Sequence, residues 1–203
     1  MSIVTYNNRS IRNISAVPGA AKSLTHIKTL TASSSSTLSF VNGSSDVVLD
    51  STYPIYMFKF INLHPANNDV IFQTNFRDGG SNFDATKTTT NFEATNTESG
   101  TSGFKYGTGD DIAQGTGSQR TGLVGNDNDE SVCGFLHLFN PSSTTFVKHF
   151  MARTQGYYAG STAWSNFMGG YCNTTTAIDG VEFSMSSGNI DSGTIKLYGI
   201  KDS

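Results

Sequence analysis

The chain has 203 residues, of which 36% are hydrophobic and only 14% are charged, and its formal net charge is −3. The 13 basic residues are scattered singly, which argues against a nucleic-acid-binding surface. No apolar run reaches the roughly 18 residues of a membrane-spanning helix, and the N-terminus lacks the basic and apolar segments of a signal peptide, so we expect synthesis in a cytoplasm without export by that route.

Residues 1–23 are polar, have no lasting periodicity and are interrupted by Val17-Pro18-Gly19. We interpret them as an extended N-terminal arm that docks on a neighbour, with a frayed terminus as the alternative. The remaining residues, 24–203, are predicted to form one β-sandwich domain.

Strand signals begin near Leu24, and strands are predicted at 26–31, 37–41, 56–63 and 70–76. Residues 56–63 carry the strongest signal, because large apolar side chains occupy both of the faces that a period of two defines. Tyr56, Phe58 and Phe60 share one face, while Met57, Ile61 and Leu63 share the other. This pattern predicts a central strand that is covered on both sides.

Residues 82–129 are mostly Thr, Asn, Gly and Ser with isolated apolar residues. Edge strands are expected near 87–94 and 103–106, joined by long exposed loops. Regular alternation returns at 131–139, 146–153, 164–171, 177–186 and 194–200. Strands at intervals of about 8–12 residues predict an all-β protein, an antiparallel two-sheet sandwich that is jelly-roll-like.

No catalytic constellation, cofactor motif or metal-ligand spacing is present, so we expect no enzyme, cofactor or bound metal. His137 and His149 are expected to face each other across the turn at Pro141, without further ligands. The acidic residues around Asp127 and Asp129 are interpreted as a solvated turn, with a structural cation as the alternative.

Cys133 and Cys172 are far apart in the sequence, each within a predicted strand, and are expected to be buried thiols rather than a disulfide. Tyr157, Tyr158 and Trp164 flank a Gly160-Ser161 turn. They are predicted to fill the sandwich end or a subunit contact, and the alternative is contact with a ligand such as a sugar ring.

Several segments resemble a family of tailed-bacteriophage virion proteins that is frequent in marine phages. The resemblance runs through Ile27–Ser35, Tyr56–Ala66, Arg77–Asp84, Met185–Ile190 and the closing strand Gly193–Lys201, and it covers roughly residues 24–201. It implies a jelly-roll-like sandwich without catalytic residues that decorates a head or belongs to a tail or fibre.

The expected function is therefore that of a non-enzymatic structural subunit on the outer surface of a tailed-phage virion. It would act through contacts with other capsid or tail proteins and form a closed homo-oligomer, for which threefold symmetry is our choice. The alternative is a tail-fibre module that recognises a host surface glycan. Neither hypothesis involves nucleic acid or membrane insertion.

Overall fold

The computed structural model describes residues 23–158 and 161–201, so the arm expected over 1–23 lies outside the described residues except for its last one. All regular secondary structure in the described residues is β-strand. The strands are β1 (Leu24–Thr31), β2 (Thr37–Val41), β3 (Ile55–Pro65), β4 (Val70–Arg77), β5 (Lys87–Thr97), β6 (Ser102–Tyr106), β7 (Gln119–Val124), β8 (Val132–Phe139), β9 (Lys148–Tyr158), β10 (Thr162–Cys172), β11 (Gly180–Met185) and β12 (Ile190–Ile200).

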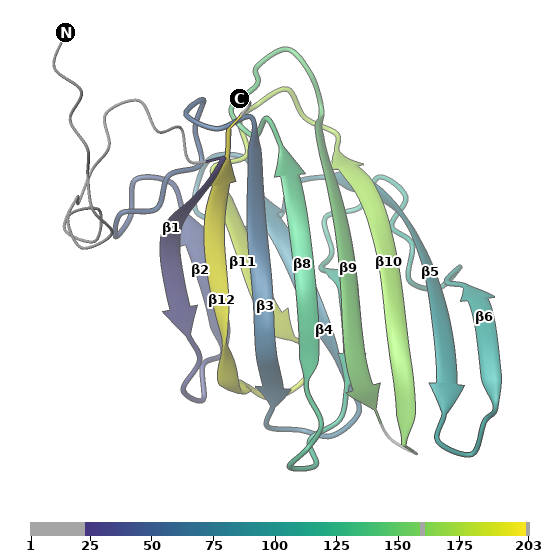
Figure 1. Ribbon diagram of the computed structural model, residues 1–203. Helices are drawn as coiled ribbons and strands as arrows, with labels where there is room; N and C mark the ends of the chain where they lie inside the picture. Colours follow the sequence, from purple (N-terminus) through teal and green to yellow (C-terminus); the bar gives the residue numbers. More distant parts are fainter. Residues whose placement is uncertain (1–22, 159–160, 202–203) are drawn as a thin grey trace, which may run out of the picture.

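The strands form two sheets. Eight strands pair in the order β1-β12-β3-β8-β9-β10-β5-β6, and four pair in the order β2-β11-β4-β7. All pairings are antiparallel. Figure 1 shows the four-stranded sheet behind the eight-stranded one. The prediction of an all-β, antiparallel two-sheet sandwich is therefore confirmed.

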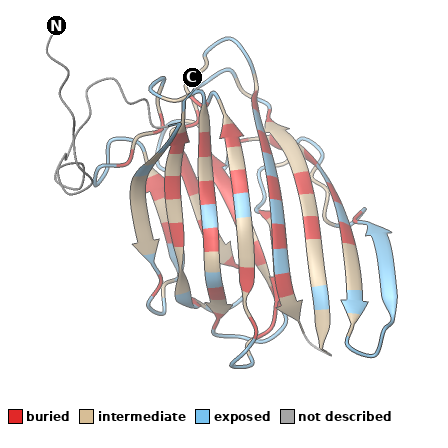
Figure 2. Ribbon diagram, viewed as in Figure 1, coloured by how far each residue is buried: buried red, intermediate tan, exposed pale blue. Residues whose placement is uncertain are grey.

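The core lies between the sheets and is built largely of phenylalanine. Phe183 of β11 has its ring 5.4 Å from Phe58 and 5.2 Å from Phe60, both on β3, and 5.8 Å from Phe72 on β4. All four side chains are buried. Figure 2 shows the alternating buried and less buried bands along the strands that period-two patterning produces.

Among residues 23–158 and 161–201, the eight-stranded sheet is covered on one face only, which corrects the expectation for β3. Tyr56, Phe58 and Phe60 are buried as predicted, whereas Met57 on the other face is only half-buried and Lys59 is exposed. Leu63 was expected beside Met57, but it is buried. A register irregularity between Phe60 and Leu63 shifts the alternation there and returns Leu63 to the core.

The polar middle of the chain contains more regular structure than expected. β5 is an interior strand that pairs with both β10 and β6, so of the two expected edge strands only β6 lies at an edge of the eight-stranded sheet. β7 was not predicted at all. Its residues Leu123 and Val124 are buried, but the flanking Gln119 and Thr121 are buried polar residues that conceal the alternation.

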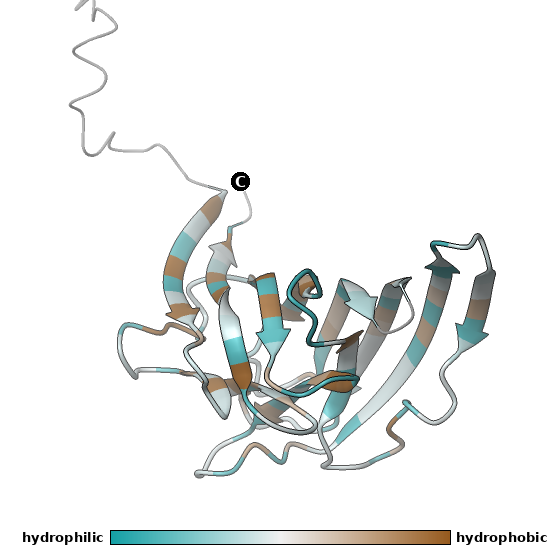
Figure 3. Cartoon of the chain, turned by 90° about the horizontal axis from the view of Figure 1, so that it is seen from below, coloured by the Kyte–Doolittle hydropathy of each residue, from teal (hydrophilic) through white to brown (hydrophobic). Residues whose placement is uncertain are grey.

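Figure 3 looks from below and shows the large sheet as a shallow trough. Its two edges, formed by β1 and β6, rise above its middle. The hollow side of this trough is the face that the small sheet does not cover. We call it the open face.

Candidate functional site

Strand register brings aromatic and basic side chains into continuous rows across the open face. One row runs from Tyr106 through Phe92, Phe167, Arg153, Phe135, Lys59 and Lys196 to Thr29. Paired residues of antiparallel strands project on the same side of a sheet, so these side chains are neighbours on one face. We call this line the aromatic row.

Contacts between the rings hold the aromatic row together. Phe92 and Phe167 stack with ring centroids 4.8 Å apart and planes 5° from parallel. The guanidinium of Arg153 lies 4.8 Å from the centre of the Phe167 ring, a cation–π arrangement. Phe104 lies 5.7 Å from Phe92 and is 74% exposed. Apolar surface of this kind, gathered on one face, is typical of an interaction site.

The next row is formed by Thr90, Gly169, Met151, His137, Met57, Tyr198 and His26. Gly169 has no side chain, and the space between the two rows forms a hollow of about 380 Å³ that Phe135, Met151, Arg153 and Phe167 help to line. Burial lowers the pKa of His137, which also lines it. The centre of the open face is thus an apolar depression with one cation at its wall.

The two rows are positively charged, in contrast to the chain as a whole. Arg153, Lys59 and Lys196 lie in the aromatic row, and neither row contains an aspartate or glutamate. The whole chain is nevertheless net negative. The centre of the open face is therefore basic, and the rest of the protein is correspondingly acidic.

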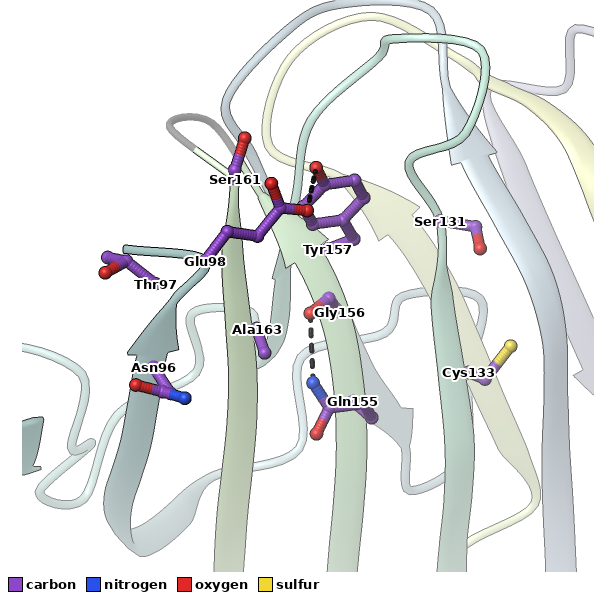
Figure 4. Close-up of a pocket in the computed structure, with 10 residues that line it drawn as sticks. All are labelled: Asn96, Thr97, Glu98, Ser131, Cys133, Gln155, Gly156, Tyr157, Ser161 and Ala163. Carbon is purple, nitrogen blue, oxygen red and sulfur yellow. Dashed lines mark hydrogen bonds between the residues drawn. The ribbon is translucent and has the colours of Figure 1, made fainter. Parts of the chain in front are cut away.

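A more polar hollow of about 530 Å³ lies at one end of the open face (Figure 4). Tyr157 projects into it and donates a hydrogen bond from its hydroxyl to the Glu98 carboxylate, with 3.3 Å between the oxygens. The Gln155 side chain donates to the Gly156 carbonyl. Asn96 and Cys133 also line this hollow. An aromatic ring beside amide and carboxylate groups suits a polar ligand such as a sugar.

The three aromatic residues expected near the Gly160-Ser161 turn do not share one surface. Tyr157 lies on the open face, whereas Tyr158 and Trp164 lie on the opposite face with their rings 5.6 Å apart. Arg120 covers the Trp164 ring at 5.1 Å. Adjacent residues of a strand point to opposite sides of the sheet, so the three rings do not form one contact surface, and contact of any one of them with a ligand stays a prediction.

Arg120 is the centre of a partly buried charge cluster on the covered side. It lies 2.9 Å from Asp110 and 3.4 Å from Glu93, and Lys105 lies 3.3 Å from the same Glu93. The Glu93 side chain is only 2% exposed, and an unpaired charge there would be costly. The two cations compensate its negative charge. The cluster anchors β5 to β7 and leaves no free carboxylate at Glu93.

The histidines and the acidic turn that the sequence analysis considered do not come together in one site. His137 pairs with Met151 rather than with His149, so the expected pairing of the two histidines is wrong. In the turn with Asp127 and Asp129, the Glu130 carboxylate accepts a hydrogen bond from the Asp127 backbone. No group of three or more His, Cys, Asp or Glu residues that could hold a metal ion occurs within 23–158 and 161–201.

The two cysteines are unpaired thiols. Cys172 is buried as expected, whereas Cys133 is half-exposed and donates to the Asn62 side chain. Burial raises the pKa of Cys172 to about 12.

Comparison with known proteins identifies no relative: no family model, curated protein or solved structure matches the chain. The described residues contain no helix that is long and apolar enough to cross a membrane.

Sequence reasoning missed the aromatic row, because the strands at 131–139, 146–153 and 164–171 were predicted without a decision on which of their faces the second sheet covers. One signal was available. Phe135-Leu136-His137 and Met151-Ala152-Arg153 place a charged or titratable residue two positions from an apolar one, which is unusual for a fully buried face.

Proposed function

We propose that the chain is a non-enzymatic structural subunit on the outer surface of a tailed-phage virion, and that it docks on an acidic protein surface through its open face. The aromatic row carries this proposal. Aromatic side chains and arginine dominate the binding energy of protein interfaces, and here they stand on a rigid sheet with cations and without carboxylates in the two central rows. The resemblance of residues 24–201 to virion proteins supports the placement on a virion.

The same charge distribution supports self-association in a ring. Two open faces would repel each other, since both carry Lys59, Arg153 and Lys196. The open face of one copy and the acidic remainder of the next are complementary. A repeated head-to-tail contact of this kind closes into a ring when the rotation between copies closes, and otherwise extends into a filament. We propose three copies per ring. Sedimentation of the purified chain at low and high salt measures its oligomeric state, and a monomer under both conditions would exclude the ring.

Incorporation into particles tests the docking face. Phage particles that carry the chain are purified after complementation with Arg153→Glu or Thr37→Glu. Thr37 is exposed at the start of β2 in the other sheet and serves as the matched control. We expect Arg153→Glu to reduce the chain in particles at least tenfold and Thr37→Glu to leave it unchanged. Equal incorporation of both variants, or absence of the wild-type chain from particles, refutes the proposal.

The hollow at Tyr157 supports a second candidate, recognition of a host glycan. Tyr157 offers a ring face, and Glu98, Gln155 and Asn96 offer polar groups around it. A glycan array with the purified chain tests this candidate. Saturable binding that is lost in Tyr157→Ala and kept in Phe104→Ala favours it, whereas no binding by the wild-type chain excludes it for the glycans on the array. Release of reducing ends from a host polysaccharide would contradict both functions.

A further inference from the structure

Two lysines are fully buried on the covered side of the large sheet. Lys87 of β5 and Lys148 of β9 pair with Cys172 of β10 from either side, so the three residues form one line across three strands. A buried ammonium group is costly unless an anion compensates it. Among the residues that the structure describes, no carboxylate lies within 4.0 Å of either lysine. The charge of both lysines is therefore unexplained by ion pairing.

The Lys87 amine lies against a side-chain amide. Its Nζ atom is 2.7 Å from Oδ1 of Asn75 and 3.1 Å from the Ala85 carbonyl oxygen. Asn75 belongs to β4 of the small sheet and is itself only 8% exposed. An amine and a carboxamide thus meet between the two sheets in a site from which water is largely excluded.

The surroundings favour attack by the amine on the carboxamide carbon. Burial lowers the pKa of Lys87 to about 8, so a fraction of the side chain is the neutral, nucleophilic amine near neutral pH. The backbone N–H of Phe76 donates to the same Oδ1 atom at 3.0 Å. A donor in this position stabilises the negative charge that develops on the oxygen when the carbon becomes tetrahedral.

We propose that Lys87 and Asn75 are joined by an intramolecular isopeptide bond. The Nζ–Cγ bond forms, the Cγ–Nδ2 bond breaks, and a proton moves from Nζ to the departing nitrogen, which leaves as ammonia. Starting from the lysine ammonium, the products are a secondary amide and an ammonium ion. No oxidant or reductant takes part. The reaction replaces a buried cation with a neutral amide.

The bond would connect the two layers of the sandwich covalently. Asn75 lies in β4 and Lys87 in β5, the strands on either side of the loop 78–86, and they belong to different sheets. A cross-link of this kind resists separation of the sheets and survives denaturation, which suits a protein exposed to proteases outside a cell.

Mass spectrometry of the denatured full chain tests the bond. The expected mass is about 17 Da below that of the sequence, the mass of one ammonia. Trypsin should fail to cut after Lys87, so that the peptide of residues 60–77 stays attached to the peptide of residues 78–105. This wild-type digest decides the question without any variant. An unmodified mass together with cleavage after Lys87 overturns the proposal.

Three variants identify the residues from which the ammonia is lost. Lys87→Arg and Asn75→Ala should restore the unmodified mass. Lys148→Arg is the matched control, because Lys148 is equally buried but donates to the Thr174 backbone carbonyl instead of a side-chain amide. It should retain the lower mass. A lower mass that persists in Lys87→Arg places the loss elsewhere, for example at Asn42-Gly43, and refutes the bond.

Discussion

Phe183 and Phe60 face each other across the two sheets with their ring centroids 5.2 Å apart and their planes 71° from parallel. This edge-to-face contact links the small sheet to a central strand of the large one. Phe183 also contacts Phe40 at 6.2 Å and Phe58 at 5.4 Å. It is therefore the side chain on which most of the aromatic core converges.

Replacing Phe183 should be among the most destabilising single changes in the core. Phe183→Ala removes a fully buried ring and leaves a cavity between the sheets, which we expect to lower the free energy of unfolding by about 3–5 kcal/mol. Urea denaturation monitored by circular dichroism measures the change. Phe104→Ala, at a ring that is 74% exposed, is the control and should change stability by less than about 0.5 kcal/mol. Similar losses for both variants would contradict the packing described here.

Gly156 allows the two sheets to approach each other beside the Tyr157 hollow. A Cβ atom at this position would lie 2.2 Å from the Leu123 carbonyl oxygen of β7. Gly156→Ala should therefore force the strands apart and cost about 1–3 kcal/mol of stability. In Gly169→Ala, on the neighbouring strand, the nearest atom is 3.9 Å away, and we expect a neutral or slightly stabilising effect. Thermal unfolding of the pair checks this difference, and equal effects would refute it.

The two thiols should differ strongly in reactivity. Burial holds the Cys172 thiol protonated by raising its pKa to about 12, and the thiolate is the reactive form. Cys133 is half-exposed on the open face. At pH 8 we expect iodoacetamide to modify Cys133 in the folded protein and Cys172 only after unfolding. Peptide mapping identifies the labelled residue, and rapid labelling of Cys172 in the native protein would contradict its burial.

His137 should make the protein less stable in mild acid. Burial lowers its pKa in the folded state, so the unfolded chain binds a proton more readily. Stability is then lost as the pH falls below the ordinary histidine value of about 6.5, because protonation favours the unfolded chain. His137→Gln should flatten this dependence in denaturation curves of the variant and the wild-type chain between pH 5 and pH 7. A wild-type stability that does not fall in this range would exclude the effect.

Much of the fold could be predicted because period-two alternation is local. The strand at 37–41 matches β2 in full, and the expected strands at 70–76 and 131–139 lie within one residue of β4 and β8 at each end. β7 was not predicted from the sequence, because Gln119 and Thr121 are buried polar residues. Their side chains form hydrogen bonds with Thr89 and Thr74 respectively. Those partners are distant in the sequence and become neighbours only in the folded chain.

The amino-acid sequence by itself determined that this protein is all-β and that Tyr56, Phe58 and Phe60 share one face of a strand. Those properties follow from the alternation of side chains along an extended backbone. Only the tertiary structure decided which face of each strand the second sheet covers, and hence that Phe167 and Arg153 are left on an open face. It also brought Lys87 to Asn75. Coverage and contact depend on the packing of strands that are distant in the chain, and period-two alternation alone does not specify that packing.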